Sequence, residues 1–333
     1  MRSTVRVSTP ARLHLGFLDL NGSSGRKFGS IGLAINSHDT VIEAKLASST
    51  IVNSEIASTK LCQRIESIIE QFYSSLGQHI PIAQQGVALS IMNAIPSHAG
   101  LGSGTQLALA VGTALCKLHQ LPVNTRDIAS QLDRGKRSGI GIATFDLGGF
   151  IVDGGLKHSS TTPPLLGHYE FPESWRIVTI LDHANQGVHG EDELRAFKDL
   201  PTFPLSNSQA ICHLTLMKLL PALVEQDIDS FGEAITSIQS LIGDHFAPAQ
   251  GGRYTSQHVA SLLNHAQNLG HKGIAQSSWG PTGCIFVDNE NSATQLIEEL
   301  KQHAQAHFDK ESSLSFAMAQ ANSSGANIEI TTP

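Results

Sequence analysis

The chain of 333 residues has few aromatic residues, few cysteines and no excess of positive charge. Four scattered cysteines without paired spacing exclude a disulfide framework and favour reduced thiols in the cytoplasm. The formal net charge of -7 argues against a nucleic-acid-binding face, because phosphate contacts along a duplex need clustered Lys and Arg. The sequence also lacks an apolar run of the roughly 18 residues that span a bilayer. We therefore expect a cytoplasmic protein with no nucleic-acid partner and no membrane contact.

The length allows two domains of ordinary size, each with its own hydrophobic core. A polar segment rich in Ser, Thr and Pro at 157–172 predicts the boundary, which divides the chain into 1–165 and 166–333. The first part alternates strands and helices, and the second separates its strands by pairs of helices. This order favours an α+β fold, with the second part's helices on one face of an antiparallel sheet.

Local patterns predict the individual elements of both parts. We expect strands at 4–8, 12–17, 29–35, 41–46, 87–92, 148–155, 175–181, 284–287 and 328–331. We expect helices at 61–76, from 107 to 118, from Thr125 onward, at 210–224 and at 294–306. The helix at 210–224 is interrupted by Pro221 near its end.

The most informative segment is a glycine-rich stretch at 95–106, which connects the strand at 87–92 to an apolar helix. Its glycines let the backbone approach a ligand closely, and the helix behind it offers unpaired N–H groups and the positive end of its dipole. We predict that this loop binds phosphate through Gly100, Leu101, Gly102, Ser103, Gly104, Thr105 and Gln106. A glycine turn that only packs the strand on the helix is an alternative of equal weight.

The amino-acid sequence of the loop excludes several phosphate-binding families. A Walker loop needs a lysine before the helix, and none occurs at 93–116. The spacing Gly100-x-Gly102-x-Gly104 does not fit a dinucleotide fingerprint. The stretch resembles instead the second motif of the GHMP kinase superfamily, P-x-x-x-G-L-G-S-S-A. Residues 96–103 match this motif, and Gly104 replaces its second serine.

An N-terminal segment at 9–19 places Arg12 and His14 on one face of a strand, with Asp19 just beyond. An arginine there could clamp a carboxylate or phosphate with two parallel hydrogen bonds. Taken alone, the segment favours a solvated polar face opposite a row of apolar residues.

A basic, glycine-spaced segment follows at 134–145, in which Lys136, Arg137 and Ser138 could grip a pyrophosphate or a 5′-phosphate. A solvated charged surface is the alternative of equal weight.

A third glycine-rich turn at 276–283 corresponds in place to the third GHMP motif. Its candidate substrate contacts are Ser277, Ser278, Trp279, Gly280, Thr282 and Gly283. Trp279 could stack on an aromatic ring, or it could anchor the loop as a buried side chain. Histidines elsewhere show no complete metal-ligand set. His303 and His307 are one helical turn apart without a third ligand, and His183 and His189 have no potential metal ligands near them in the sequence.

Together these segments resemble the β-ribofuranosylaminobenzene 5′-phosphate synthase family of the GHMP superfamily, over about residues 10–286. The resemblance is carried by the segments 12–14, 100–106, 135–141, 148–155 and 277–283. It implies a GHMP-kinase-like fold, with a ribosomal-protein-like N-terminal half and a ferredoxin-like C-terminal half. It also implies a cytoplasmic, Mg2+-dependent enzyme of tetrahydromethanopterin biosynthesis. Such an enzyme joins phosphoribosyl pyrophosphate to 4-aminobenzoate with loss of CO2 and pyrophosphate, and a homodimer is plausible.

The same resemblance suggests roles for single residues. Arg12 matches the arginine or lysine of the first superfamily motif, and with His14 and Asp19 it forms the candidate catalytic set. Ser103 and Thr105 are the candidate metal or phosphate contacts. An ATP-dependent small-molecule kinase is the alternative function, although Gly104 removes one loop hydroxyl that kinases use. A non-enzymatic binding domain is a second alternative, against which the acidic balance already argues.

Overall fold

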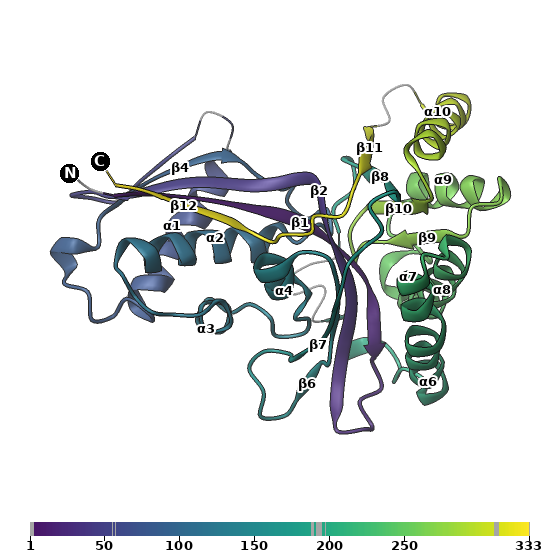
Figure 1. Cartoon of the computed structure of the whole chain (residues 1–333), viewed down its shortest axis with the longest axis horizontal. Coiled ribbons are helices and arrows are strands. Elements are labelled where there is room, and N and C mark those ends of the chain that lie inside the picture. Colours follow the sequence, from purple (N-terminus) through teal and green to yellow (C-terminus); the bar gives the residue numbers. More distant parts are fainter. Residues whose placement is uncertain are drawn as a thin grey trace.

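The computed structural model describes residues 3–54, 56, 58–187, 190, 195–196, 198–309 and 313–332, and His189 lies outside them. The chain forms two halves, each built on its own sheet (Figure 1). Helices and sheets mix in both halves, so the α+β prediction is confirmed. No described helix has the length and apolar character needed to cross a membrane.

The N-terminal half is built on an eight-stranded sheet whose main path is β12-β1-β2-β4-β3, with β5, β6 and β7 attached beside it. These strands are β1 (Thr4–Asp19), β2 (Arg26–Leu46), β3 (Ile51–Asn53), β4 (Val87–Asn93), β5 (Phe150–Asp153), β6 (Leu156–Lys157), β7 (Leu165–Tyr169) and β12 (Asn327–Thr331). Strands β1 and β2 each run without a break where the sequence predicted two strands. Pro10 is the reason in β1, because it lies at a register shift that interrupts the ladder without ending the strand.

The α-helices described in this half are α1 (Thr59–Ser74), α2 (Ser103–Leu118), α3 (Thr125–Gln131) and α4 (Ile140–Leu147). In Figure 1, α1 and α2 lie together below the sheet. The predicted helix at 61–76 is α1, which buries one apolar face, and Ser58 caps it by accepting from the Leu61 amide. Helix α2 is buried along most of its length. Gly112 allows α3 to pack closely, because a Cβ there would lie 2.5 Å from Ile128 Cγ2.

The C-terminal half is a four-stranded antiparallel sheet in the order β11-β8-β10-β9. Its strands are β8 (Arg176–Asp182), β9 (Gly273–Gln276), β10 (Thr282–Val287) and β11 (Leu314–Ala319). Its helices are α6 (Leu205–Leu214), α7 (Leu220–Glu225), α8 (Ile228–Gln250), α9 (Gln257–Asn268) and α10 (Glu290–His307). The predicted helix at 210–224 is instead α6, a π-helical turn at Thr215–Leu219 and α7. Pro221 is the second residue of α7, directly after the π-helical turn, so its missing N–H falls where the hydrogen-bond pattern changes from π-helical to α-helical.

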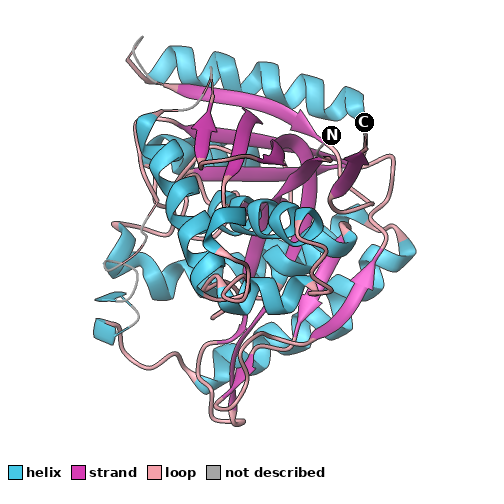
Figure 2. Ribbon diagram, turned by 90° about the vertical axis from the view of Figure 1, so that its left-hand side faces the viewer, coloured by secondary structure: helices cyan, strands magenta, loops and turns pink. Residues whose placement is uncertain are grey.

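The last strand returns to the first half. β12 pairs antiparallel with β1, from Thr4 opposite Thr331 to Ser8 opposite Asn327. The two termini therefore lie side by side at the far end of the N-terminal half (Figure 2). The division expected at residue 165 separates the two sheets only in part, because β7 and β12 both join the larger sheet.

Candidate active site

Three segments that are far apart in the sequence meet between the two halves. The Arg12 amide on β1 donates to the Leu101 carbonyl of the glycine loop at 3.1 Å. The His14 amide donates to Ser277 Oγ at 3.0 Å, and Ser277 Oγ donates to the Gly100 carbonyl at 2.7 Å. The structure thus brings together the first-motif strand, the glycine loop and the third glycine-rich turn.

Glycines permit this close approach. A Cβ on Gly100 would lie 2.2 Å from the Ser277 carbonyl oxygen, and one on Gly280 would lie 2.4 Å from Ala99. Gly102 is left-handed, with φ of 84°, and it is the residue from which α2 begins. The glycines of both loops are therefore required for packing the loops on each other, in addition to any contact with a ligand.

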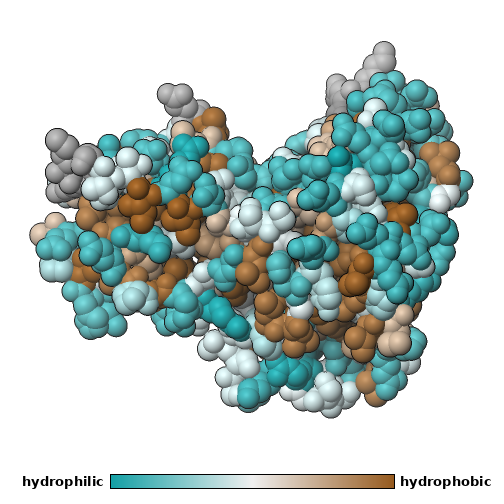
Figure 3. Space-filling view, viewed as in Figure 1, coloured by the Kyte–Doolittle hydropathy of each residue, from teal (hydrophilic) through white to brown (hydrophobic). Residues whose placement is uncertain are grey.

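A cleft of about 480 Å³ opens over this junction. Cationic side chains dominate its lining, which includes Arg12, Arg134, Lys136 and Arg137 together with Gly100, Thr105, Ser138, Ser278, Trp279 and Gly280. Figure 3 shows a notch between the two halves at the upper edge of the molecule, whereas helices α2 and α4, which contribute Thr105 and Gly141 to the cleft, lie below the sheet in the same view (Figure 1). Such a cleft suits an anionic ligand, because clustered cations between low-dielectric walls focus their field on it.

The glycine loop divides into residues that face the cleft and residues that do not. The first turn of α2 begins at Ser103, earlier than predicted, so Ser103 and Thr105 are part of the helix and are half-buried. Leu101 is buried in the core. Gln106 is also buried, and its amide accepts from Thr9 and donates to the Gly141 carbonyl at 2.8 Å. Leu101 and Gln106 therefore support the loop and are not among the residues that line the cleft.

Arg12 lies across the glycine loop. Its guanidinium donates to the Gly100 carbonyl, and a Cβ on Gly102 would lie 3.0 Å from Arg12 Cγ. The side chain therefore both lines the cleft and holds the loop in place.

His14 is buried, and its ring centroid lies 4.7 Å from that of Phe17. Burial, together with the nearby Arg12 charge, lowers the His14 pKa to about 3. The imidazole is therefore neutral at physiological pH. Its Nε2 has no hydrogen-bond partner among the described residues. His14 can contribute a hydrogen bond or a packing surface, but it cannot supply a positive charge to a carboxylate.

Asp19 is not among the residues that line the cleft. Its carboxylate accepts from the amides of Asn21 and Gly22, at 2.8 and 3.0 Å, and from Ser208 Oγ at 2.8 Å. These bonds close the turn after β1 and tie it to α6 in the other half.

The basic segment is held by a buried carboxylate that the sequence did not reveal. Asp153, at the end of β5, accepts from the Gly139 amide at 2.9 Å and from Ser138 Oγ at 3.3 Å. Burial raises the Asp153 pKa to about 6 although these hydrogen bonds oppose the shift. Lys136 extends into solvent and pairs with Asp133 at 2.9 Å.

The third turn is mostly a structural closure. Trp279 is buried against Phe246, with ring centroids 4.2 Å apart, while one edge of it lines the cleft. Thr282 and Gly283 begin β10, and Thr282 Oγ1 donates to the Ala99 carbonyl at 2.6 Å. Of the other residues predicted in this turn, Ser278 and Gly280 also line the cleft.

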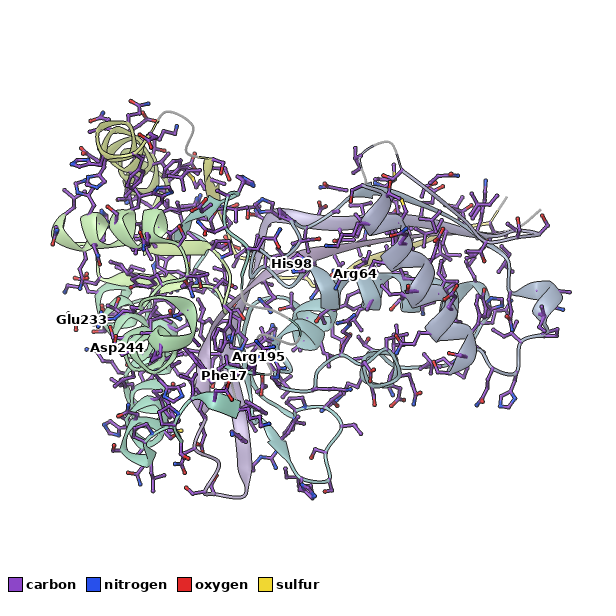
Figure 4. All side chains as sticks on the ribbon, turned by 180° about the vertical axis from the view of Figure 1, so that it is seen from behind. Phe17, Arg64, His98, Arg195, Glu233 and Asp244 are labelled. Atoms are coloured by element: carbon purple, nitrogen blue, oxygen red, sulfur yellow. The ribbon has the colours of Figure 1, made fainter. Side chains whose placement is uncertain are left out.

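Sequence reasoning missed Arg64, which reaches from α1 to the start of α2. A Cβ on Gly104 would lie 2.5 Å from Arg64 Nη2 and 3.8 Å from Arg134 Nη1. In Figure 4, Arg64, His98, Arg195 and Phe17 appear around the junction of the halves, whereas Glu233 and Asp244 lie out on the helices of the C-terminal half. A single arginine on the polar side of an amphipathic helix carries no sequence signal that separates it from a solvated residue.

Carboxylates do not gather in this cleft. Within the described ranges, no group of three or more His, Cys, Asp or Glu side chains could hold a metal ion. Ser103 and Thr105 offer only neutral hydroxyl oxygens, and Mg2+ usually binds through one or two carboxylates together with substrate phosphates.

Comparisons with known proteins agree with this geometry. The model of the GHMP kinases N terminal domain matches residues 61–149, and that of the GHMP kinases C terminal domain matches residues 219–306. The beta-ribofuranosylphenol 5'-phosphate synthase of Methanocaldococcus jannaschii is 35% identical over 306 residues, covering 85% of this chain and 90% of that protein. The protein of the same name from Archaeoglobus fulgidus is 33% identical, covering 90% of this chain and 92% of that protein.

Solved structures confirm the fold. A homoserine kinase from Cytophaga hutchinsonii superposes with a TM-score of 0.66 at 17% identity, covering 98% of this chain and 97% of that one. The mevalonate diphosphate decarboxylase of Enterococcus faecalis gives 0.65 at 17% identity, covering 99% and 100%. The chain belongs to the GHMP kinase family and, within it, to the family of the beta-ribofuranosylphenol 5'-phosphate synthases.

Proposed function

We propose that this member of the synthase family transfers the phosphoribosyl group of phosphoribosyl pyrophosphate to a para-substituted benzoate, releasing CO2 and pyrophosphate. The observation that carries the proposal is the cleft whose lining combines Arg12, Arg134, Lys136 and Arg137 with Gly100 and Thr105 at the glycine loop. Phosphoribosyl pyrophosphate is strongly anionic, and this lining supplies cations and few carboxylates.

The residues of the cleft fit the charge that develops in such a transfer. Departure of pyrophosphate builds negative charge on the leaving group, and preorganised N–H groups and guanidiniums stabilise that charge. The sugar carbon becomes electron-poor, and the ring carbon that bears the carboxylate attacks it. Loss of CO2 then restores the aromatic ring. Arg12 is placed to hold an anionic group against the glycine loop, whereas neutral His14 can only offer a hydrogen bond.

We propose that Mg2+ enters the cleft on the substrate's diphosphate and is not held by a protein cage. The absence of a carboxylate cluster among the described residues supports this. Thr105 lines the cleft and Ser103 lies beside it in the first turn of α2, so these hydroxyls remain the proposed protein contacts of the ion. The ion would neutralise charge on the departing pyrophosphate. Titration of binding should therefore show Mg2+ affinity only when pyrophosphate is present.

Two acceptors deserve comparison. The family resemblance implies 4-aminobenzoate and a place in tetrahydromethanopterin biosynthesis, and we propose this acceptor first. The relatives are named for a ribosylated phenol, which makes 4-hydroxybenzoate the second candidate. Both have an electron-donating para group that enriches the ring carbon bearing the carboxylate, so the same chemistry serves either.

The test uses the purified chain, phosphoribosyl pyrophosphate, Mg2+ and each acceptor labelled in its carboxyl group. We expect one labelled CO2 for each pyrophosphate and a product whose mass lacks the carboxyl group. Release of pyrophosphate with the label retained would indicate N- or O-glycosyl transfer and would contradict the mechanism.

The kinase alternative is tested in parallel with labelled ATP and candidate alcohols. We expect no phosphorylated product above background, because Gly104 lacks the hydroxyl of the kinase motif and Arg64 occupies the space beside it. Rapid ATP-dependent phosphorylation of any alcohol would replace the synthase proposal.

A further inference from the structure

Two guanidinium groups meet over the first turn of α2. Arg64 comes from the middle of α1 and Arg134 from the segment after α3, and both lie within 4 Å of the Cβ position of Gly104. Arg134 also lines the cationic cleft, so Arg64 stands directly behind a residue of the proposed substrate site.

Holding these two guanidinium groups close together destabilises the protein when no anion is bound. Burial lowers the pKa of Arg64, and burial together with the Arg64 charge lowers that of Arg134. In the described parts of the chain, the Arg64 side chain has no hydrogen-bond or ion-pair partner, and Arg134 Nε is buried without one. Asp133, the acid whose charge acts on Arg134, pairs with Lys136 at 2.9 Å. Two half-buried like charges without a shared carboxylate are best satisfied by an anion.

Gly104 is coupled to this pair. Its φ is not in the left-handed region, so the backbone itself does not require glycine. The space that a side chain would fill is occupied by Arg64 Nη2. The departure from the superfamily motif at this position therefore makes room for an arginine from another helix.

We propose that Arg64 and Arg134 form a two-guanidinium site that binds one phosphate group of the substrate at the start of α2. The inference rests on the proposed function and assigns to it a residue from outside the three sequence motifs. Each guanidinium can present two parallel N–H donors to phosphate oxygens, and the unpaired N–H groups of the helix add to the same anion. The group is either the 5′-phosphate or one end of the pyrophosphate.

Calorimetric titration with two probes distinguishes a site for the 5′-phosphate from a site for the pyrophosphate. Ribose 5-phosphate carries only the first kind of group, and inorganic pyrophosphate only the second. We expect Arg64→Met and Arg134→Met to weaken the binding of one probe by at least about tenfold, the size of a lost charge-assisted hydrogen bond. The other probe should change by less than about twofold. The control Arg6→Met removes a half-buried arginine of the same half that donates to Met92 Sδ, and should change neither.

Stability separates a binding role from a structural one. Arg64→Met removes one of two repelling charges, so we expect its urea unfolding midpoint to equal or exceed that of the wild type. Affinities that match those of Arg6→Met would overturn the proposal. Equal losses for both probes would overturn it as well, because they would indicate a general field and no defined phosphate site.

Gly104→Ala supplies an independent test. The new Cβ should displace Arg64 and weaken binding of the same probe, although alanine favours the helix. In the Arg64→Met background the same change should have no further effect, and full additivity would contradict the coupling. These measurements need no turnover. A wild type that binds both probes but forms no C-ribosyl product would therefore defeat only the proposed function.

Discussion

Ser277 Oγ donates to the carbonyl of Gly100 at 2.7 Å, which joins the third glycine-rich turn to the phosphate loop. The same oxygen accepts from the His14 amide at 3.0 Å, so one buried hydroxyl connects all three motifs. The shape of the cleft therefore depends on the contact between the two halves.

Replacing Ser277 by alanine should remove both hydrogen bonds and leave the buried His14 amide unsatisfied, whereas the Gly100 carbonyl keeps the Arg12 guanidinium as a donor. We expect a loss of about 1–3 kcal/mol in the free energy of unfolding and weaker binding of phosphoribosyl pyrophosphate. Urea denaturation and calorimetry measure the two effects. Ser67→Ala is the control, because Ser67 bonds only within an exposed helix turn. Equal stabilities of the two variants would show that Ser277 does not hold the loops together.

Gly102→Val is expected to abolish binding of phosphoribosyl pyrophosphate while the circular dichroism spectrum is retained. Gly102 has φ of +84°, and its added Cβ would lie 3.0 Å from Arg12 Cγ. Gly25 has the same φ with no atom within 4 Å of its Cβ position. Comparing Gly102→Ala with Gly25→Ala therefore separates backbone strain from the collision with Arg12. If both alanine variants bind the substrate normally, the collision has no functional consequence.

Arg12→Lys keeps the charge and loses the planar fork that reaches the Gly100 carbonyl. We expect kcat/KM to fall about tenfold or more, on the order of 1.4 kcal/mol. Arg6→Lys, on the same strand, is the control. Unchanged kinetics in Arg12→Lys would show that the planar fork of Arg12 is not needed for the reaction.

The parts of the site whose residues are consecutive in the sequence could be predicted from it. The composition of the glycine loop, the basic segment and the third turn identifies each of them, and the structure brings them to one cleft. The start of α2 was placed late, because Gly104 and the hydroxyl residues Ser103 and Thr105 in its first turn are weak helix formers.

The rest depends on long-range packing. Nothing in residues 59–74 distinguishes Arg64 from other polar residues of α1, and its role appears only when Gly104 is seen beside it. The pairing of β12 with β1 joins opposite ends of the chain, which a search for local boundaries cannot detect. Gln106 was assigned to the ligand because it follows the motif, whereas the helix turns it toward Thr9 and Gly141.

Asp153 should make the stability of the protein depend on pH in an unusual direction. Its pKa is raised from an ordinary value of 3.8 to about 6, so between these values the folded protein holds a proton that the unfolded chain has released. Stability should therefore fall as pH rises through this window, by up to roughly 3 kcal/mol, and then level off.

The variant Asp153→Asn lacks this titration but keeps an oxygen that can accept from the Gly139 or the Gly155 amide. Its side-chain NH2 faces the other amide, so the variant should be less stable than the wild type at pH 4. The difference in stability between the variant and the wild type should narrow by pH 7, because only the wild type loses stability through this titration between pH 4 and pH 7. Urea unfolding at pH steps from 4 to 7 measures this, with exposed Asp309→Asn as the control. A difference that stays constant with pH would show that the carboxyl is already ionised when folded, and that the basic segment is held by a charge from pH 4 upward.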